Sequence, residues 1–373
     1  MLQTWKPAPQ PTPSWVWQKR RPKMLVTDLL RKVVVFVGHN GVQGDFIADG
    51  TGFIFLEIAY GFAFPYVVTA KHVVDQAAGR EGKNEILLRF NKKDGSGVDY
   101  VKTILSRWQI HPDHVESGRK QNYIDVAVFG LLDYEHWAAS DITQKLDFVH
   151  LDEEDICTAS IIEKYAIGLG DEVVIPGLFH SHMGITQNVP VMRTGNIASM
   201  RTEPVPTSRG VMDAYLVEMR SVGGISGSPV LTHMAVRPQV LLPESPESTK
   251  IEQSLKTHYL LGLIHGHYTI TTQDEWAFKT DQQVGDINAG IAIVVPADRI
   301  TETIAKSALF ERERDMARRY DEVRKAQSKT VEDSAPSGGA SVPPATDANP
   351  THREDFNSLV GAAARKRTPD DQT

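Results

Sequence analysis

Short apolar segments separated by turn residues fill most of the chain from residue 33 to about residue 297. Many short strands at this spacing indicate a barrel or sandwich rather than alternating strands and helices. A polar, acidic stretch near residues 135–160 divides the series, so we expect antiparallel barrels over about 33–140 and 150–297. The expected strands lie near residues 33–37, 52–56, 66–69, 85–90, 126–129, 173–175, 189–192, 215–217, 259–264 and 291–295.

The pattern changes after Pro296. Residues 298–327 have a helical composition, and Ile300 and Ile304 lie one turn apart, so this C-terminal helix is expected to pack on the second barrel. Residues 328–373 are rich in Ser, Pro, Ala, Gly, Thr and Asp, which is typical of a disordered tail. Residues 1–32 form an N-terminal extension rich in Pro and Trp.

Composition narrows the possible environments and partners. The 373 residues carry a net charge of −7, so there is no positive field to attract nucleic acid. No run of about 20 apolar residues predicts a membrane span, and the first residues lack a signal-peptide pattern, so a cytoplasmic protein is expected. The single cysteine, Cys157, excludes an intrachain disulfide, and its acidic neighbours oppose a reactive thiolate.

Three short motifs carry candidate chemistry. The first is a strand ending in Thr-Ala-Lys before His72, the second is Asp125 at the head of the strand Val-Ala-Val, and the third is a glycine-rich turn around Ser226. A serine hydroxyl needs a base, an imidazole has a suitable pKa, and a carboxylate can hold the imidazole in the required tautomer. The backbone N–H groups of Gly224 and Ser226 are candidates for an oxyanion hole. The three motifs together predict a His72–Asp125–Ser226 catalytic triad.

In these motifs the sequence resembles the trypsin/chymotrypsin-like serine peptidase family. The resemblance covers about residues 33–297, and the run 226–231 is closest to the bacterial branch that includes glutamyl endopeptidases. It implies two six-stranded antiparallel β-barrels of trypsin type, with the active site between them. It also implies a serine endopeptidase that cleaves peptide bonds through an acyl-enzyme, with a protein or peptide substrate and neither a cofactor nor a metal.

The departures from the family pattern concern activation and specificity. Ile225 replaces the aspartate that receives a newly cut N-terminus, so activation by N-terminal cleavage is not expected. Arg220 lies six residues before Ser226, and His265 falls where the family usually has serine, a departure that bears on substrate preference and, to a lesser degree, on the support of Asp125. Together with His267, these two residues predict a pocket of hydrogen-bond donors for an acidic or amide side chain. The alternative is that Arg220 points to solvent and the pocket is small and apolar.

Other interpretations of the same sequence stay open. A catalytically silent member of the fold would bind peptides or a partner through its cleft, its C-terminal helix or its tail, and a viral-type or toxin-associated processing enzyme is a third possibility. Asp113 is a rival for the triad acid, but no apolar strand follows it. Histidine pairs at 111 and 114, 180 and 182, and 265 and 267 have metal-ligand spacing without a convincing third ligand.

Overall fold

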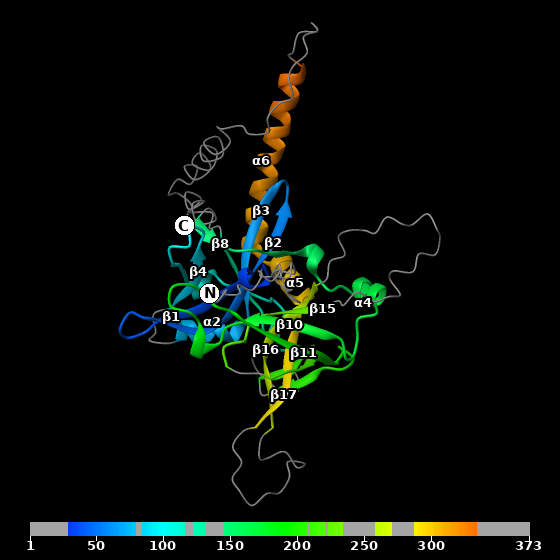
Figure 1. Ribbon diagram of the computed structural model, residues 1–373. Helices are drawn as coiled ribbons and strands as arrows, with labels where there is room; N and C mark the ends of the chain where they lie inside the picture. The colour runs from blue at the N-terminus through cyan, green and yellow to red at the C-terminus, as the bar shows by residue number, and fades with distance from the viewer. Residues whose placement is uncertain are drawn as a thin grey trace, which may run out of the picture.

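The computed structural model describes residues 29–79, 84–115, 122–131, 145–207, 209–220, 223–233, 258–270 and 287–333. These residues form mostly antiparallel β-sheets followed by helices at the C-terminal end (Figure 1), so the predicted all-β fold class is confirmed. Most of the predicted N-terminal extension and tail lies outside the described residues. Among the described helices, none is long and apolar enough to cross a membrane.

The first half of the chain forms a nine-stranded sheet with the order β5-β4-β1-β2-β3-β7-β6, on which β8 pairs with β4 and β9 pairs with β2. The end strand β6 has only two residues because Pro112 follows shortly after and cannot donate to a ladder. Within the described residues no β5–β6 pair closes this path, so the first of the two predicted barrels is described as a sheet. Its strands are β1 (Val34–Asn40), β2 (Phe46–Ala59), β3 (Phe62–Thr69), β4 (Glu85–Lys92), β5 (Val98–Ile104), β6 (Gln109–Ile110), β7 (Ala127–Gly130), β8 (Leu146–Asp147) and β9 (Leu151–Asp152).

The second half forms a closed six-stranded barrel with the order β10-β11-β14-β17-β16-β15, as predicted. A separate hairpin, β12 (Val205–Thr207) and β13 (Gly210–Met212), lies outside this barrel. The barrel strands are β10 (Glu172–Gly177), β11 (Val191–Ser199), β14 (Tyr215–Glu218), β15 (Pro229–His233), β16 (His258–Ile270) and β17 (Ile287–Pro296).

Short helices connect the strands. Of these, α2 (Lys71–Gly79) matters most for the candidate site, because it begins directly after β3 and packs its apolar face on the first sheet. The other connecting helices are α1 (Leu29–Lys32), α4 (Ala159–Tyr165) and the 3-10 turns at Leu105–Arg107, Glu153–Asp155 and His180–His182.

The β2–β3 hairpin is much longer than the sequence pattern predicted. Its ladder runs without interruption from the Gly52–Thr69 pair to the Ala59–Phe62 pair. The two turn residues, Tyr60 and Gly61, have φ values of 54° and 78°. Two successive left-handed residues give the tight turn that matches strand twist, so pairing continues to the tip.

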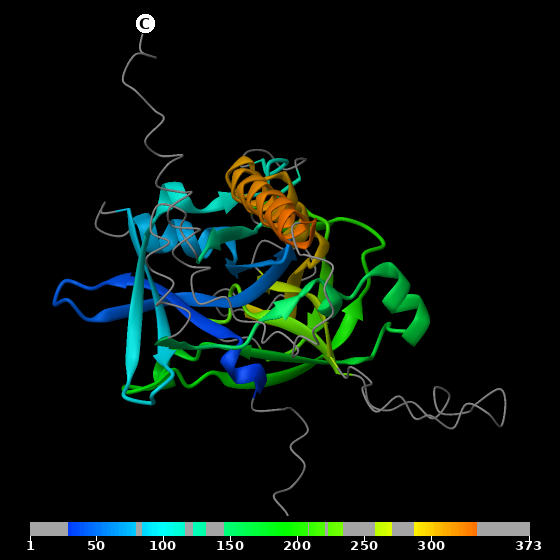
Figure 2. The same cartoon turned by 90° about the horizontal axis from the view of Figure 1, so that it is seen from above.

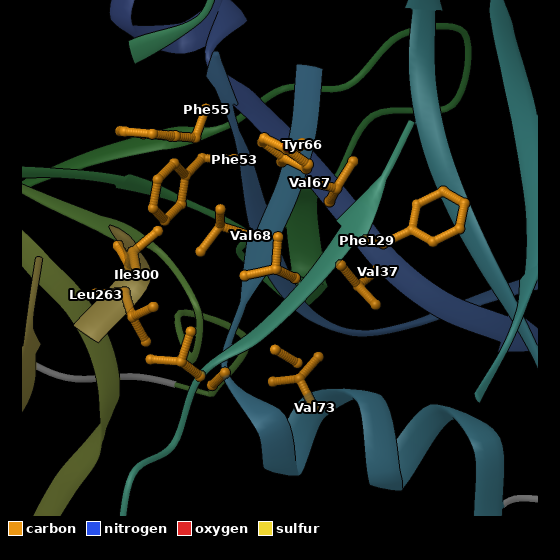
Figure 3. Packing of buried hydrophobic residues seen from close by; sticks show 14 of the residues in the cluster. Val37, Phe53, Phe55, Tyr66, Val67, Val68, Val73, Phe129, Leu263 and Ile300 are labelled. Atoms are coloured by element: carbon orange, nitrogen blue, oxygen red, sulfur yellow. The ribbon is translucent and has the colours of Figure 1, made fainter. Parts of the chain in front are cut away.

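Side chains from both halves share one apolar core. Figure 3 shows Phe53 and Val68 of the first sheet close to Leu263 of β16 and Ile300 of the C-terminal helix, and all four belong to one buried cluster. A second cluster fills the closed barrel, and Ile264 of β16 belongs to it. Because adjacent residues of a strand point to opposite faces, β16 contributes Leu263 to one cluster and Ile264 to the other.

The C-terminal region contains two helices, where one was predicted over 298–327. Helix α5 (Asp298–Lys306) ends at Ser307, and α6 (Ala308–Asp333) begins after it. The Ser307 hydroxyl accepts a hydrogen bond from the Phe310 backbone N–H at 3.3 Å and donates to Gln109 at 3.0 Å. Ser307 therefore caps the second helix and fixes the break against the first sheet.

Helix α6 extends from the body of the molecule beside the β2–β3 hairpin (Figures 1 and 2). The buried Phe310 ring lies 4.7 Å from the Tyr66 ring, and further along the helix the rings of Tyr320 and Phe62 are 5.6 Å apart. Arg314 pairs with Glu57 at 3.2 Å. Through these contacts, α6 supports the part of the β2–β3 hairpin that projects beyond the sheet.

Replacing Phe310 with alanine is expected to lower the free energy of unfolding by about 3–5 kcal/mol, because the ring is fully buried between Tyr66 and the sheet. Urea denaturation followed by circular dichroism measures this loss. Val323→Ala on the same helix is the control, since Val323 is 41 % exposed. Equal stability losses in the two variants would contradict the docking of α6 through Phe310.

Cys157 is buried, and burial raises the pKa of its thiol to about 12. The thiolate that reacts with disulfide reagents is therefore essentially absent at neutral pH. We expect no labelling by a disulfide reagent at pH 7 in the native protein and stoichiometric labelling in urea. Rapid labelling of the folded protein would show that Cys157 is accessible.

Candidate active site

His72 is the second residue of α2, directly after the strand that ends at Thr69. Its backbone N–H is one of the donors that a helix leaves free in its first turn, and it donates to Asp125 Oδ1 at 2.9 Å. The ring Nδ1 lies 2.6 Å from Asp125 Oδ2. Asp125 therefore holds His72 through both its backbone and its imidazole.

Asp125 lies in the segment before β7 and is completely buried. The neighbouring backbone is held by hydrogen bonds from Tyr123 N–H to the Val211 carbonyl at 2.9 Å and from Ile124 N–H to His114 Nδ1 at 3.2 Å. Burial by itself raises the pKa of Asp125, but the attraction of His72 and hydrogen bonds from two imidazoles outweigh it and hold the pKa far below its usual range. Asp125 is therefore ionised at neutral pH.

The second imidazole on Asp125 belongs to His265 of β16. Its Nδ1 lies 2.5 Å from Asp125 Oδ2, the same oxygen that His72 contacts. The pairing of β16 with β17 is irregular between Ile264 and Gly266, which turns the ring toward the first half of the protein. The sequence analysis assigned His265 mainly to the specificity pocket and related position 265 to the support of Asp125 only through the family resemblance.

Ser226 lies in a tight turn in which Gly224 and Gly227 have φ values of 98° and 83°. Its hydroxyl donates to the His265 carbonyl oxygen at 3.1 Å. Among the described residues no hydrogen bond joins Ser226 to His72. Ile225 is buried in the apolar cluster of the barrel, so packing anchors this position beside Ser226.

Thr51 of β2 ties the Ser226 turn to the first sheet. Its backbone N–H donates to the Ser226 carbonyl at 2.9 Å, and its hydroxyl donates to the Gly224 carbonyl at 2.8 Å. The same hydroxyl accepts from the Leu178 N–H at 2.9 Å. The sequence predicted a strand near 52–56, but the hydrogen bonds of Thr51 to the Ser226 turn join residues far apart in the chain and cannot be read from a local pattern.

Close packing at this junction requires glycine. A Cβ at Gly227 would overlap the Thr51 carbonyl oxygen and the Thr69 hydroxyl. At Gly224, a Cβ would lie 3.0 Å from Nε2 of His180, an exposed residue of the 3-10 turn after β10. His180 therefore borders the predicted oxyanion hole, a position that its spacing in the sequence did not reveal.

The three residues of the predicted specificity pocket lie in different environments. The His265 ring is buried and bonded to Asp125, whereas Arg220 and His267 are exposed. The neighbouring residues 221–222 and 271–286 lie outside the described residues. A specificity role for Arg220 and His267 stays a prediction.

The remaining candidate ligands have other partners. Asp113, the rival triad acid, pairs with Lys306 of α5 at 2.7 Å. His111 Nε2 lies 2.9 Å from Glu302, and His114 accepts from the backbone. His180 and His182 are exposed in one 3-10 turn. Within the described part of the chain, the group of metal-ligand type with at least three members is His72, Asp125 and His265.

No known family model matches the chain, and no curated protein matches it significantly. Among solved structures, the protease domain of MamO from Magnetospirillum magneticum in its apo form is 17 % identical, with 74 % of this chain and 96 % of that chain covered and a TM-score of 0.39. An inactive serine-to-alanine mutant of Rv3671c from M. tuberculosis H37Rv is 15 % identical, covering 80 % and 96 %, with a TM-score of 0.34. At these scores, the function has to be argued from the site of this chain alone.

From the hydrogen bonds of the Thr51 hydroxyl we predict a specific loss of stability when the hydroxyl is removed. Thr51→Val keeps the shape of the side chain but leaves the half-buried Gly224 carbonyl and the buried Leu178 N–H without their partner, so we expect a loss of about 1–3 kcal/mol. Thr51→Ser keeps the hydroxyl and is the matched control. Denaturant midpoints measure both, and a serine variant no more stable than the valine variant would contradict the role of the hydroxyl.

Proposed function

We propose that this protein is a serine endopeptidase with His72, Asp125 and Ser226 as its triad. The observation that carries the proposal is the ionised, buried Asp125 bonded to both the backbone N–H and Nδ1 of His72. With its proton on Nδ1, the neutral imidazole has a free lone pair on Nε2. That is the tautomer a general base requires.

In the proposed reaction, the Ser226 hydroxyl turns from the His265 carbonyl to His72 Nε2 and attacks the carbonyl carbon of a peptide bond. His72 takes the hydroxyl proton, and the backbone N–H groups of Gly224 and Ser226 bind the oxyanion. His72 then gives the proton to the leaving amine, which departs and leaves an acyl-enzyme. Water, activated by the same imidazole, releases the acid and restores Ser226.

The resting hydrogen bond of Ser226 is compatible with this cycle. Its 3.1 Å length is at the long end for a hydroxyl donor, and catalytic hydrogen bonds often form only when substrate is bound.

We assign the activity to the family of trypsin-like peptidases, because the order His, Asp, Ser and the placement of each residue match its motifs. A cytoplasmic location is proposed on the sequence pattern alone.

For specificity we propose an acidic or amide residue before the scissile bond. Arg220 and His267 remain exposed donors, while His265 is removed from this role by its bond to Asp125. A guanidinium favours a carboxylate and repels lysine and arginine side chains. The glutamyl-endopeptidase-like run after Ser226 supports the same preference.

The second candidate is a catalytically silent peptide-binding module of the same fold. The specific observation in its favour is that the Ser226 hydroxyl donates to the His265 carbonyl and not to His72. If this arrangement persisted in the presence of substrate, the serine would not be activated. The two functions therefore differ in the reactivity of one hydroxyl.

Labelling by a fluorophosphonate distinguishes them. The wild-type protein is expected to be labelled at Ser226, and Ser226→Ala is expected to abolish labelling and to lower kcat for peptide hydrolysis on the order of a million-fold. Ser181→Ala, which changes an exposed serine of the 3-10 turn, is the matched control and should be labelled like the wild type. A folded wild-type protein that is neither labelled nor active would favour the binding module.

A further inference from the structure

Two imidazoles share one carboxylate oxygen in the candidate site. Nδ1 of His72 and Nδ1 of His265 lie 2.6 and 2.5 Å from Asp125 Oδ2. The two rings are almost perpendicular, with an interplanar angle of 77° and centroids 5.3 Å apart. The Nδ1 atoms of both histidines are therefore directed at Asp125 Oδ2.

Holding Asp125 in place does not require a second imidazole. A hydroxyl of the kind that the family resemblance predicts at position 265 would donate one hydrogen bond equally well. An imidazole adds a nitrogen lone pair when its proton moves to the other ring nitrogen. Two imidazoles and one carboxylate form a common donor set for zinc and similar divalent transition-metal ions.

We propose that a divalent transition-metal ion of the zinc type binds between His72 Nδ1, Asp125 Oδ2 and His265 Nδ1 and inhibits hydrolysis. The inhibition rests on the proposed function, whereas the metal binding does not. The ion would replace the two hydrogen bonds that now join the imidazoles to Asp125.

The geometry requires small movements. The three candidate ligand atoms lie within 4.8 Å of one another. Ligands about 2.0–2.1 Å from a tetrahedral zinc ion are about 3.3 Å apart, so each Nδ1 would move away from Asp125 Oδ2 by less than about 1 Å. Asp125 Oδ1 stays bonded to the His72 backbone N–H at 2.9 Å, which keeps Oδ2 directed at the ion.

The proton balance explains the inhibition. Each neutral imidazole moves its proton from Nδ1 to Nε2 when Nδ1 binds the metal, so no proton is lost from the rings. His72 Nε2 then carries a hydrogen and cannot accept the proton of Ser226. The bound metal thus places His72 in the wrong tautomer for a general base, an effect known to reduce triad catalysis severely.

Calorimetric titration of Zn²⁺ into the full-length Ser226→Ala variant tests the binding without any dependence on catalysis. We expect one Zn²⁺ per chain and no binding of Mg²⁺, which prefers oxygen ligands. His265→Asn keeps an N–H donor toward Asp125 but offers no ligating nitrogen, so we expect it to weaken Zn²⁺ binding by at least about tenfold. His265→Ser is the second variant, and melting temperatures check that both are folded.

His267→Ser, an exposed histidine two residues further along β16, is the matched control and should bind Zn²⁺ like its parent. Failure of Zn²⁺ to bind, or equal affinity in folded His265→Asn, would overturn the proposal. In the active protein, Zn²⁺ should inhibit over the concentration range in which it binds, with recovery after chelation. Zn²⁺ binding that depends on His265 in a protein without any hydrolase activity would leave the metal site in place and reject the peptidase.

Discussion

The rest of the structure depends on the complete burial of one carboxylate, Asp125. An unpaired charge in the protein interior costs several kcal/mol, so Asp125 is tolerable only where donors surround it. Three donors meet it: the backbone N–H and the ring of His72, and the ring of His265. The start of α2 and the irregular part of β16 must therefore lie against the segment before β7, which fixes how the two halves of the chain approach each other.

Further contacts hold the two halves of the chain together, both within their interface and outside it. Within the interface, Thr51 bonds to the Ser226 turn, and the apolar core passes from the first sheet to Leu263. Outside it, α5 connects to both halves, because Glu302 lies 2.9 Å from His111 while Arg299 pairs with Asp213 at 3.0 Å. The helix is therefore a structural part of the interface between the two halves and not an appendage of the second barrel.

The sequence predicted the strands and the triad motifs because both depend on local patterns. Apolar segments separated by turn residues mark strands. His72 comes shortly after the end of one strand and Asp125 just before the start of another, so both are predicted to lie at the edge of a sheet. The partner of a side chain across 140 positions is not local, so the bond between His265 and Asp125 does not follow from a local pattern, and only the family resemblance related position 265 to Asp125. The same limit applies to the helix break, since the cap at Ser307 depends on Gln109 of the first sheet.

His265 contacts two members of the candidate triad with different parts of one residue. Its ring donates to Asp125, and its backbone carbonyl accepts the hydroxyl of Ser226. A neutral carbonyl is a weaker acceptor than an imidazole nitrogen whose ring is polarised by an adjacent carboxylate. The Ser226 hydroxyl is thus held by the weaker of two acceptors in the same site. A metal ion on Nδ1 or the loss of Asp125 would shift the His72 proton to Nε2. The stronger acceptor, His72 Nε2, is then lost, and the Ser226 hydroxyl stays bonded to the His265 carbonyl.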